Sequence, residues 1–433
     1  MRLKFPLFIL LTAAYTNGQP ARWEFQGFWE NRGYLYFRVP HQEDSRAEGD
    51  SHVQWKTHFK LKHFSCTATP ELWIDSRHQI DRRSASLSDR TDQRPALGFS
   101  ELYLDVPVGN LDLRIGKQQI IWGRADGWNP TDNVTSFDYL DLIDNERLGT
   151  TAVRVRRYFG SSSLDLVWTP LFTPTRLPLL HGRWFPLPQG LPTFPVAFRS
   201  SVRLPPSTFA NSQFAARWDR TQQGWDYSLS YFKGWNDLAA FTPTLSNFTP
   251  LPSPSRPVTV DLARSFRRLE VMGGDFAATP HGIGVRGEMA FFRPESKEND
   301  SALVDDRNYM QYALGADKHY GEWFLLGEIL GDSSFGHSQS NSQAGRFRFP
   351  DRGLGHSLLG RVERTINPWS SFRVTTIIRF SGHGFLLQPA YQYQVSQAWK
   401  AEAGILILGG NSDDFLGQYR DNTRLYVKLR KSF

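Results

Sequence analysis

Basic side chains recur at every second position in several segments of this chain of 433 residues, with apolar residues between them. In the segment 370–380, Arg373 and Arg379 alternate with Phe372, Val374 and Ile378. A row of guanidinium or ammonium groups attracts and orients anions, whereas covalent chemistry also needs a nucleophile or a general base. This spacing therefore indicates recognition of negative charge rather than catalysis.

Catalytic and metal-binding patterns are sparse. The segment 355–359 places Ser357 after a glycine and a histidine but lacks the second glycine of a nucleophile elbow, and Ser381 near His383 has no orienting acid beside it. The eleven histidines show no zinc-binding spacing, and no phosphate-binding glycine loop is present. We expect no enzyme activity, no metal and no cofactor.

The chain reads as a series of strands with two kinds of connection. About eighteen segments alternate apolar and polar residues, and no helical period persists beyond two turns. Tight turns such as 107–109 alternate with long polar or proline-rich loops such as 123–147 and 171–207. This asymmetry is typical of outer-membrane barrels, and hydrocarbon does not tolerate an open sheet edge. We predict an all-β fold: a closed, transmembrane, antiparallel up-and-down β-barrel of 16 to 18 strands.

The start of the chain and its composition agree with export. Residues 1–18 combine Arg2 and Lys4 with a short apolar stretch and small residues before Gln19, which predicts a secretory signal peptide. Residues 19–433 then form one barrel with long external loops. The single cysteine, Cys66, excludes an intramolecular disulfide.

A net charge of +7 and a pI of 9.4 are compatible with nucleic-acid binding. No aromatic–basic module of a known type appears, so we expect no nucleic-acid partner.

The chain ends on Phe433, behind the alternating apolar residues Leu425, Val427 and Leu429. This ending resembles the final strand of bacterial outer-membrane barrels, although Lys431 departs from the pattern. The resemblance implies location in the bacterial outer membrane, contact with outer-membrane lipid and lipopolysaccharide, and recognition by the barrel-assembly machinery through Phe433.

Strand parity separates lipid-facing from lumen-facing residues. A cation facing lipid at the bilayer midplane costs about 2–4 kcal/mol, so basic residues on the polar face must point inward. The predicted lumen and selectivity residues are Lys56, Lys60, Arg154, Arg156, Arg286, Arg361, Arg373, Arg379, Arg424 and Lys428. Inward acids, among them Asp112, Glu288, Glu363 and Glu402, count as fewer by roughly half. This predicts a basic lumen; the alternatives are pairing of these cations with lumenal acids, or binding of lipopolysaccharide phosphates at the outer rim.

The third long loop carries a distinctive motif. Gly116-Lys117-Gln118 and Trp122-Gly123 precede Asn129-Pro130-Thr131-Asp132. The motif resembles outer-membrane porin-like families that include alginate-export channels, which implies a 16- to 18-stranded barrel. If the loop folds inward as in general porins, its acids face wall arginines across a constriction: Asp126, Asp132, Asp138 and Asp141. The alternative is a turn motif that only caps the loop.

We therefore expect a porin-like channel for passive transport of small or polymeric anionic solutes. The alternative is a non-conducting structural or surface-interaction barrel whose lumen is blocked by the loop 171–207. The oligomeric state and the identity of the solute do not follow from the sequence.

Overall fold

The computed structural model describes residues 22–39, 45–185, 196–246, 258–295, 307–336 and 354–433, with no side-chain description for 82–84. The predicted signal peptide, residues 1–18, lies outside the described residues. Among the residues described, no helix is long and apolar enough to cross a membrane.

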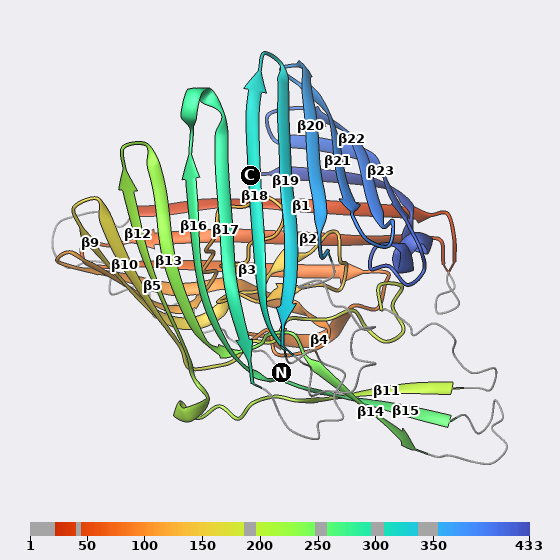
Figure 1. Ribbon diagram of the computed structural model, residues 1–433, viewed down its shortest axis with the longest axis horizontal. Coiled ribbons are helices and arrows are strands. Elements are labelled where there is room, and N and C mark those ends of the chain that lie inside the picture. The colour runs from red at the N-terminus through yellow and green to blue at the C-terminus, as the bar shows by residue number, and fades with distance from the viewer. Residues whose placement is uncertain (1–21, 40–44, 186–195, 247–257, 296–306, 337–353) are drawn as a thin grey trace, which may run out of the picture.

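Eighteen antiparallel strands of the described chain form a closed barrel, which confirms the predicted fold at the upper end of the expected strand count (Figure 1). Each strand pairs with its neighbours in the chain, and β1 pairs with β24 to close the cylinder. The barrel strands are β1 (Arg22–Tyr36), β2 (Ala47–Lys60), β3 (Ser65–Asp75), β5 (Arg94–Val108), β6 (Leu111–Gln118), β9 (Thr150–Phe159), β10 (Ser162–Thr169), β12 (Gln213–Gln222), β13 (Trp225–Trp235), β16 (Arg268–Ala278), β17 (Gly284–Pro294), β18 (Asn308–Tyr320), β19 (Trp323–Phe335), β20 (Ser357–Asn367), β21 (Ser370–Arg379), β22 (Phe385–Gln394), β23 (Trp399–Gly409) and β24 (Arg424–Ser432).

The seam between the first and last strands includes the C-terminal residue. The amide of Gly27 donates to the Phe433 carbonyl at 2.8 Å, and the Phe433 amide donates to the Gly27 carbonyl at 3.0 Å. The Phe433 ring lies over Gly27, where an added Cβ would come within 2.7 Å of a ring carbon. Glycine at this position therefore makes room for the terminal aromatic ring, and backbone pairing leaves no open edge.

The outer surface of the barrel is apolar and aromatic. Exposed side chains at alternate strand positions include Leu72, Phe372 and Val427. Trp225 and Trp323 lie exposed near the short-turn end, at the level where amphipathic rings meet a membrane interface. The opposite parity carries the polar and charged side chains, so the alternation of the sequence becomes an apolar exterior and a polar interior.

Shorter elements are not part of this cylinder of eighteen strands. β4 (Ile80–Ser86) pairs parallel to β5 as a nineteenth strand of the same sheet, and β7 (Phe137–Asp138) pairs with β8 (Glu146–Arg147). β11 (Val196–Arg203), β15 (Val258–Ser265) and β14 (Ala240–Ser246) form a three-stranded sheet at the long-loop end, where it projects beyond the barrel (Figure 1). Three short 3-10 turns are η2 (Phe209–Asn211), η3 (Pro280–Gly282) and η5 (Gly417–Asn422).

Candidate functional site

The third loop, residues 119–149 between β6 and β9 and called L3 below, folds into the barrel. Its tip is held by two wall carboxylates through backbone amides. The Ala125 amide donates to Glu288 at 2.6 Å, and the amides of Asp126 and Gly127 donate to Glu328 at 2.9 and 2.8 Å. Glu288 lies on β17 and Glu328 on β19, far along the sheet from β6 and β9. The loop therefore reaches the opposite wall.

The tip of L3 requires a glycine where it lies closest to the barrel wall, at Gly127. A Cβ added to Gly127 would lie 2.8 Å from a carboxylate oxygen of Glu328 and 2.8 Å from Leu359 Cδ1. Any larger residue would push the tip away from the wall. The Asp126 carboxylate extends the same contact, since it accepts from Arg286 at 2.5 Å, and Arg286 also pairs with Asp317.

The returning half of L3 is held by cations on the other side of the barrel. Asp141 accepts from Arg77 at 3.0 Å and from Arg424 at 2.7 Å. Asp144 accepts from Arg424 at 2.9 Å and also pairs with Lys428, both on β24. L3 is thus anchored to β17 and β19 at its tip and to β24 behind it, and it crosses the lumen.

The other two acids of the predicted constriction, Asp132 and Asp138, pair with arginines of L3, of strand β5 and of the following loop. Asp132 pairs with Arg147 of L3 itself and accepts from the Trp122 amide at 3.2 Å. Asp138 binds Arg94 at 2.8 Å and Arg176 of the following loop at 2.5 Å. All four predicted acids therefore make direct ion pairs, and three of them bind arginines outside L3.

Burial and neighbouring charges divide these acids into two groups. Burial opposes ionisation of Asp141 and Asp138, but their flanking arginines outweigh it, so the pKa of each lies below its usual value. For Asp132 burial is the stronger effect, and it raises the pKa to about 6 against the pull of Arg147. Burial likewise raises the pKa of Glu146. L3 therefore combines anchoring acids whose pKa is lowered, Asp138 and Asp141, with two acids whose pKa is raised, Asp132 and Glu146.

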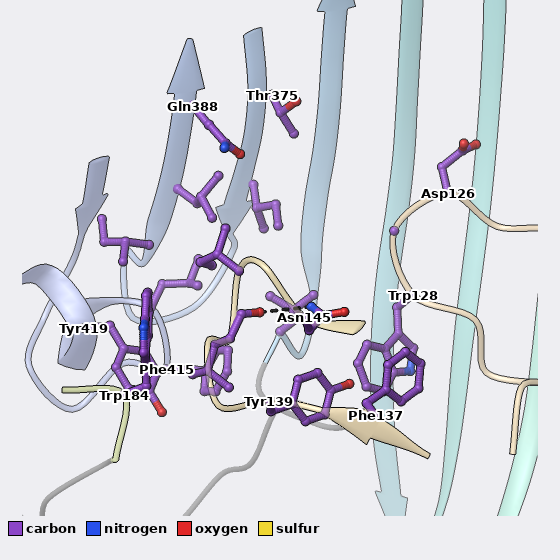
Figure 2. A pocket seen from close by; sticks show the side chains of 18 of the residues that line it. Asp126, Trp128, Phe137, Tyr139, Asn145, Trp184, Thr375, Gln388, Phe415 and Tyr419 are labelled. Atoms are coloured by element: carbon purple, nitrogen blue, oxygen red, sulfur yellow. Dashed lines mark hydrogen bonds between the residues drawn. The ribbon is translucent and has the colours of Figure 1, made fainter. Parts of the chain in front are cut away.

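A cavity of about 440 Å³ lies between L3 and the wall formed by β21 to β23 (Figure 2). Thr375 and Gln388 face it from the wall, and Asp126 and Trp128 face it from L3. Asn129, Asp132, Asn145 and Arg147 of L3 add further polar groups to the lining. The apolar and aromatic part of the lining includes Phe137, Tyr139, Trp184, Ile377, Phe415 and Tyr419. This lining suits a small solute with apolar carbon better than a chain of hydrated sugars.

The ten basic residues singled out from the sequence occupy strands of the barrel wall, and eight of them have an acid partner. The pairs that involve Arg286, Arg424 and Lys428 are given above. The others are Lys56 with Glu101 at 3.3 Å, Arg373 with Glu402 at 3.1 Å, Arg379 with Asp414 at 2.6 Å, and both Arg154 and Arg156 with Asp165. Lys60 and Arg361 have no ion pair within the described parts of the chain. Their role in selectivity stays a prediction.

The expected surplus of inward bases over inward acids is not supported. Sequence reasoning undercounted acids that lie on the cation-bearing wall and neutralise it, among them Asp105, Asp165, Asp275, Asp317 and Glu328. Their strand parity was the available signal. The lumen wall is a lattice of paired charges, which agrees with the alternative in which the cations pair with lumenal acids.

Within the described chain, a group of cations lines the end of the lumen where the tight turns lie. Arg114 pairs there with Asp105, and Arg154 and Arg156 share Asp165, so Lys60 and Lys62 are the two without an ion pair among the described residues. A cavity of about 350 Å³ there is lined by Lys60, Lys62, Arg114, Arg154 and Arg156. Asp105 and Asp112 also line it. Lys60 is exposed. We call this group of five cations the basic pocket; it holds three of the ten predicted residues together with two that the sequence analysis did not name.

Metal-binding and nucleophilic side chains do not cluster in the described residues. In the described residues no group of three His, Cys, Asp or Glu side chains could hold a metal ion. His356 Nδ1 lies 3.1 Å from the Tyr312 hydroxyl, so this ring is engaged by a tyrosine rather than directed at Ser357.

No protein-family model matches the sequence, and no curated protein matches it. Solved structures match the fold. OccAB4 of Acinetobacter baumannii superposes with a TM-score of 0.54 at 7% identity, covering 95% of this chain and 98% of that one. OccAB1 of the same organism gives 0.52 at 6% identity, with 95% and 96% covered, and OccK3 (OpdO) of Pseudomonas aeruginosa gives 0.50 at 12%, with 95% of each chain covered.

These similarities confirm the predicted fold, which is that of barrels from the bacterial outer membrane, whereas the narrower resemblance to alginate-export channels stays a prediction. The chain has the fold of an outer-membrane, porin-like β-barrel.

Proposed function

We propose that this barrel is a passive outer-membrane channel for small organic anions. A solute entering from the long-loop end passes the cavity beside L3, where apolar side chains and the amide and hydroxyl of Gln388 and Thr375 contact it. It then reaches the basic pocket at the other end of the lumen. The observation that carries the proposal is this pocket, because its five cations outnumber the acids that line it or pair with it, which are Asp105, Asp112 and Asp165. Lys60 and Lys62 supply the charge that is left uncompensated.

The paired charges of the lumen wall restrict the range of solutes that the sequence analysis allowed. Paired charges along the middle of the lumen give little net field, so selectivity arises where the charge is uncompensated. L3 crosses the lumen and is anchored on both sides, which leaves the 440 Å³ cavity as space for a compact solute. These features favour small anions over the polymeric anions that the sequence also allowed.

The test is the reversal potential of the purified protein in a planar bilayer under a potassium chloride gradient. The unmodified channel is expected to prefer chloride, and Lys60→Glu is expected to shift the reversal potential toward potassium because Lys60 lines the basic pocket without an acid partner in the described chain. A channel without preference for chloride, or an unchanged reversal potential in Lys60→Glu, would show that permeating ions do not pass the basic pocket.

Lys431→Glu provides a matched control. Lys431 lies near the same end of the barrel but on the lipid-facing parity, where it stacks against Trp399 at 5.6 Å. The two variants make the same change of charge on opposite sides of the wall. Only the lumenal one should alter selectivity.

A second function, a non-conducting barrel with a blocked lumen, is favoured by one observation. The described part of the loop 171–207 reaches the barrel interior, where Trp184 is 1% exposed and packs with Leu406, Leu408 and Tyr419. Residues 186–195 of this loop lie outside the described chain. Absence of any conductance from a correctly folded, inserted protein would support this second function.

A further inference from the structure

The outer face of the barrel carries a charged row at a level where neighbouring strands carry apolar side chains. Lys233 on β13 is directly opposite Glu270 on β16, which is opposite Arg293 on β17. Lys233 pairs with Glu270 at 2.9 Å, and Arg293 pairs with the same carboxylate. Lys233 is 61% exposed and Arg293 is 62% exposed. This row does not face the lumen.

Cross-strand register shows which way the row points. Two positions nearer the tight turns, Met272 lies opposite Phe291, and both are exposed to the membrane side, at 59% and 40%. Side chains two apart in a strand share a face, so the charged row lies on the lipid side directly above these apolar residues. At the corresponding end of other strands the outward residues are apolar, as with Ile378, Phe385 and Leu425.

The row lies at the outer edge of the apolar band. Lys233 follows the exposed Trp225 by eight positions (233 − 225), which is about 26 Å along a strand and about 20 Å across the membrane at a tilt of about 40°. The apolar band of such barrels is about 25 Å tall. The long loop 236–267 begins just beyond, so the charged ends reach the headgroup layer on the long-loop side.

A groove of about 710 Å³ runs along this row. Its walls combine the cations Lys233, Arg268 and Arg293 with two exposed rings, Phe209 from η2 and Phe214 from β12. The carboxylates of Glu270 and Glu295 also line it, so the cations outnumber the acids by one. Arg268 is held over the Trp235 ring at 4.0 Å and donates to the Ala210 carbonyl at 2.7 Å, so it forms a fixed end of the groove.

We propose that this groove binds the phosphorylated sugar headgroup of an outer-leaflet glycolipid of the lipid A type. Lys233 and Arg293 donate to a phosphate oxygen, displacing Glu270 from one or both of them. The sugar lies against Phe209 and Phe214, and acyl chains run down over Met272 and Phe291. Charge, depth and adjoining apolar surface agree on this occupant, since the outer leaflet of such membranes presents phosphate at this level above hydrocarbon.

The experiment measures lipid occupancy of the purified full chain in detergent by native mass spectrometry. The probes are lipid A with two phosphates and the same lipid A without phosphate. The unmodified protein is expected to bind the phosphorylated form, and the double variant Lys233→Gln, Arg293→Gln is expected to bind it at least about fivefold more weakly, because two charge-assisted hydrogen bonds are lost.

Two further variants control for folding and for general charge. Lys318→Gln with Arg364→Gln removes two cations from the lipid-facing side at the tight-turn end, and it should leave occupancy within about twofold. Glu270→Gln removes the carboxylate that competes for Lys233 and Arg293, so it should bind the phosphorylated lipid at least as tightly as the unmodified protein.

Equal binding of the dephosphorylated lipid A, or undiminished binding by the folded double variant, would overturn the proposal. A change of oligomeric state in the double variant without loss of lipid would assign the row to a protein contact instead. Channel conductance should be the same in all these variants, so the result is separate from that of the channel proposal.

Discussion

At the scale of single residues, the lumen is governed by ion pairs that join positions far apart in the chain. Asp141 of L3 binds Arg424 across 283 positions, and both side chains are nearly inaccessible to solvent. Removing one member of a buried pair leaves an uncompensated charge, which costs about 3–5 kcal/mol. L3 is therefore held by a few contacts of high individual consequence.

Asp141→Asn tests this anchoring. The free energy of unfolding in urea should fall by about 2 kcal/mol, because Arg77 and Arg424 both lose the Asp141 carboxylate. The loss stays below the cost of an uncompensated charge, since Arg77 keeps Glu48 and Asp50 and Arg424 keeps Asp144. The control is Asp421→Asn, which breaks the exposed pair with Arg38 at 3.0 Å and should change stability by less than about 1 kcal/mol. Equal effects of the two changes would mean that Asp141 does not anchor L3.

Asp132 gives the protein a dependence on pH. Its folded pKa of about 6 lies above the usual 3.8, so the folded state binds this proton more readily than the unfolded state does. Its contribution to stability is therefore complete below about pH 3.8 and is lost as the pH rises through about 6. In Asp132→Asn this part of the slope of unfolding free energy against pH should disappear. An unchanged slope between pH 4 and about 6.5 would contradict the assignment.

The sequence predicts which face of a strand a residue occupies, but it does not predict which residue it pairs with. Alternation predicts that Arg154 and Arg156 share a face, but it does not say that Asp165 of the next strand lies opposite Arg156. That pairing depends on register, which the turn at 160–161 sets. The contacts of Asp138 and Asp141 depend on how two long loops pack, and no local pattern encodes them.

At the scale of elements, L3 is the part that sets the width of the path. Deleting residues 126–144 should raise the single-channel conductance, because the loop crosses the lumen and contacts Glu328 at its tip. The deletion removes β7 but none of the eighteen barrel strands. A conductance equal to that of the unmodified protein would mean that the narrowest point lies elsewhere, in the loop that carries Trp184.

Gly127→Ala is a smaller change to the same element. The added methyl group would meet Glu328 and Leu359 at 2.8 Å, so the tip must move, at a cost of about 1–3 kcal/mol. Conductance should change less than in the deletion but in the same direction, measured in the same bilayer recordings. Gly33→Ala, at a strand position with no atom within 4 Å of an added Cβ, controls for loss of a glycine alone.

Barrel strands could be predicted because their residues alternate between apolar side chains that face lipid and polar side chains that face the lumen. The differences between the predicted and the observed strands have physical causes. The alternation predicts a strand over 51–65, but β2 ends at Lys60 and the turn closes at 61–64, where the Leu61 amide donates to the Phe64 carbonyl at 2.9 Å. β11, β14 and β15 were missed because they sit in loops outside the membrane, where neither face is fixed by lipid.

At the scale of the whole molecule, closure depends on the pairing of the two ends of the chain. Gly27→Leu should reduce the yield of folded barrel, because the Phe433 ring and the Gln54 carbonyl occupy the space of a side chain there. The fraction that resists unfolding in cold detergent measures this. Gly33→Leu, on the same strand with no atom within 4 Å of an added Cβ, is the control and should fold in normal yield.

Channel activity is the central claim, and planar-bilayer recording of the purified protein tests it most directly. Stepwise, ohmic openings with a reversal potential on the chloride side of zero in a salt gradient are the predicted result. A protein that inserts and is folded, yet passes no current or shows no preference for chloride, would contradict the account.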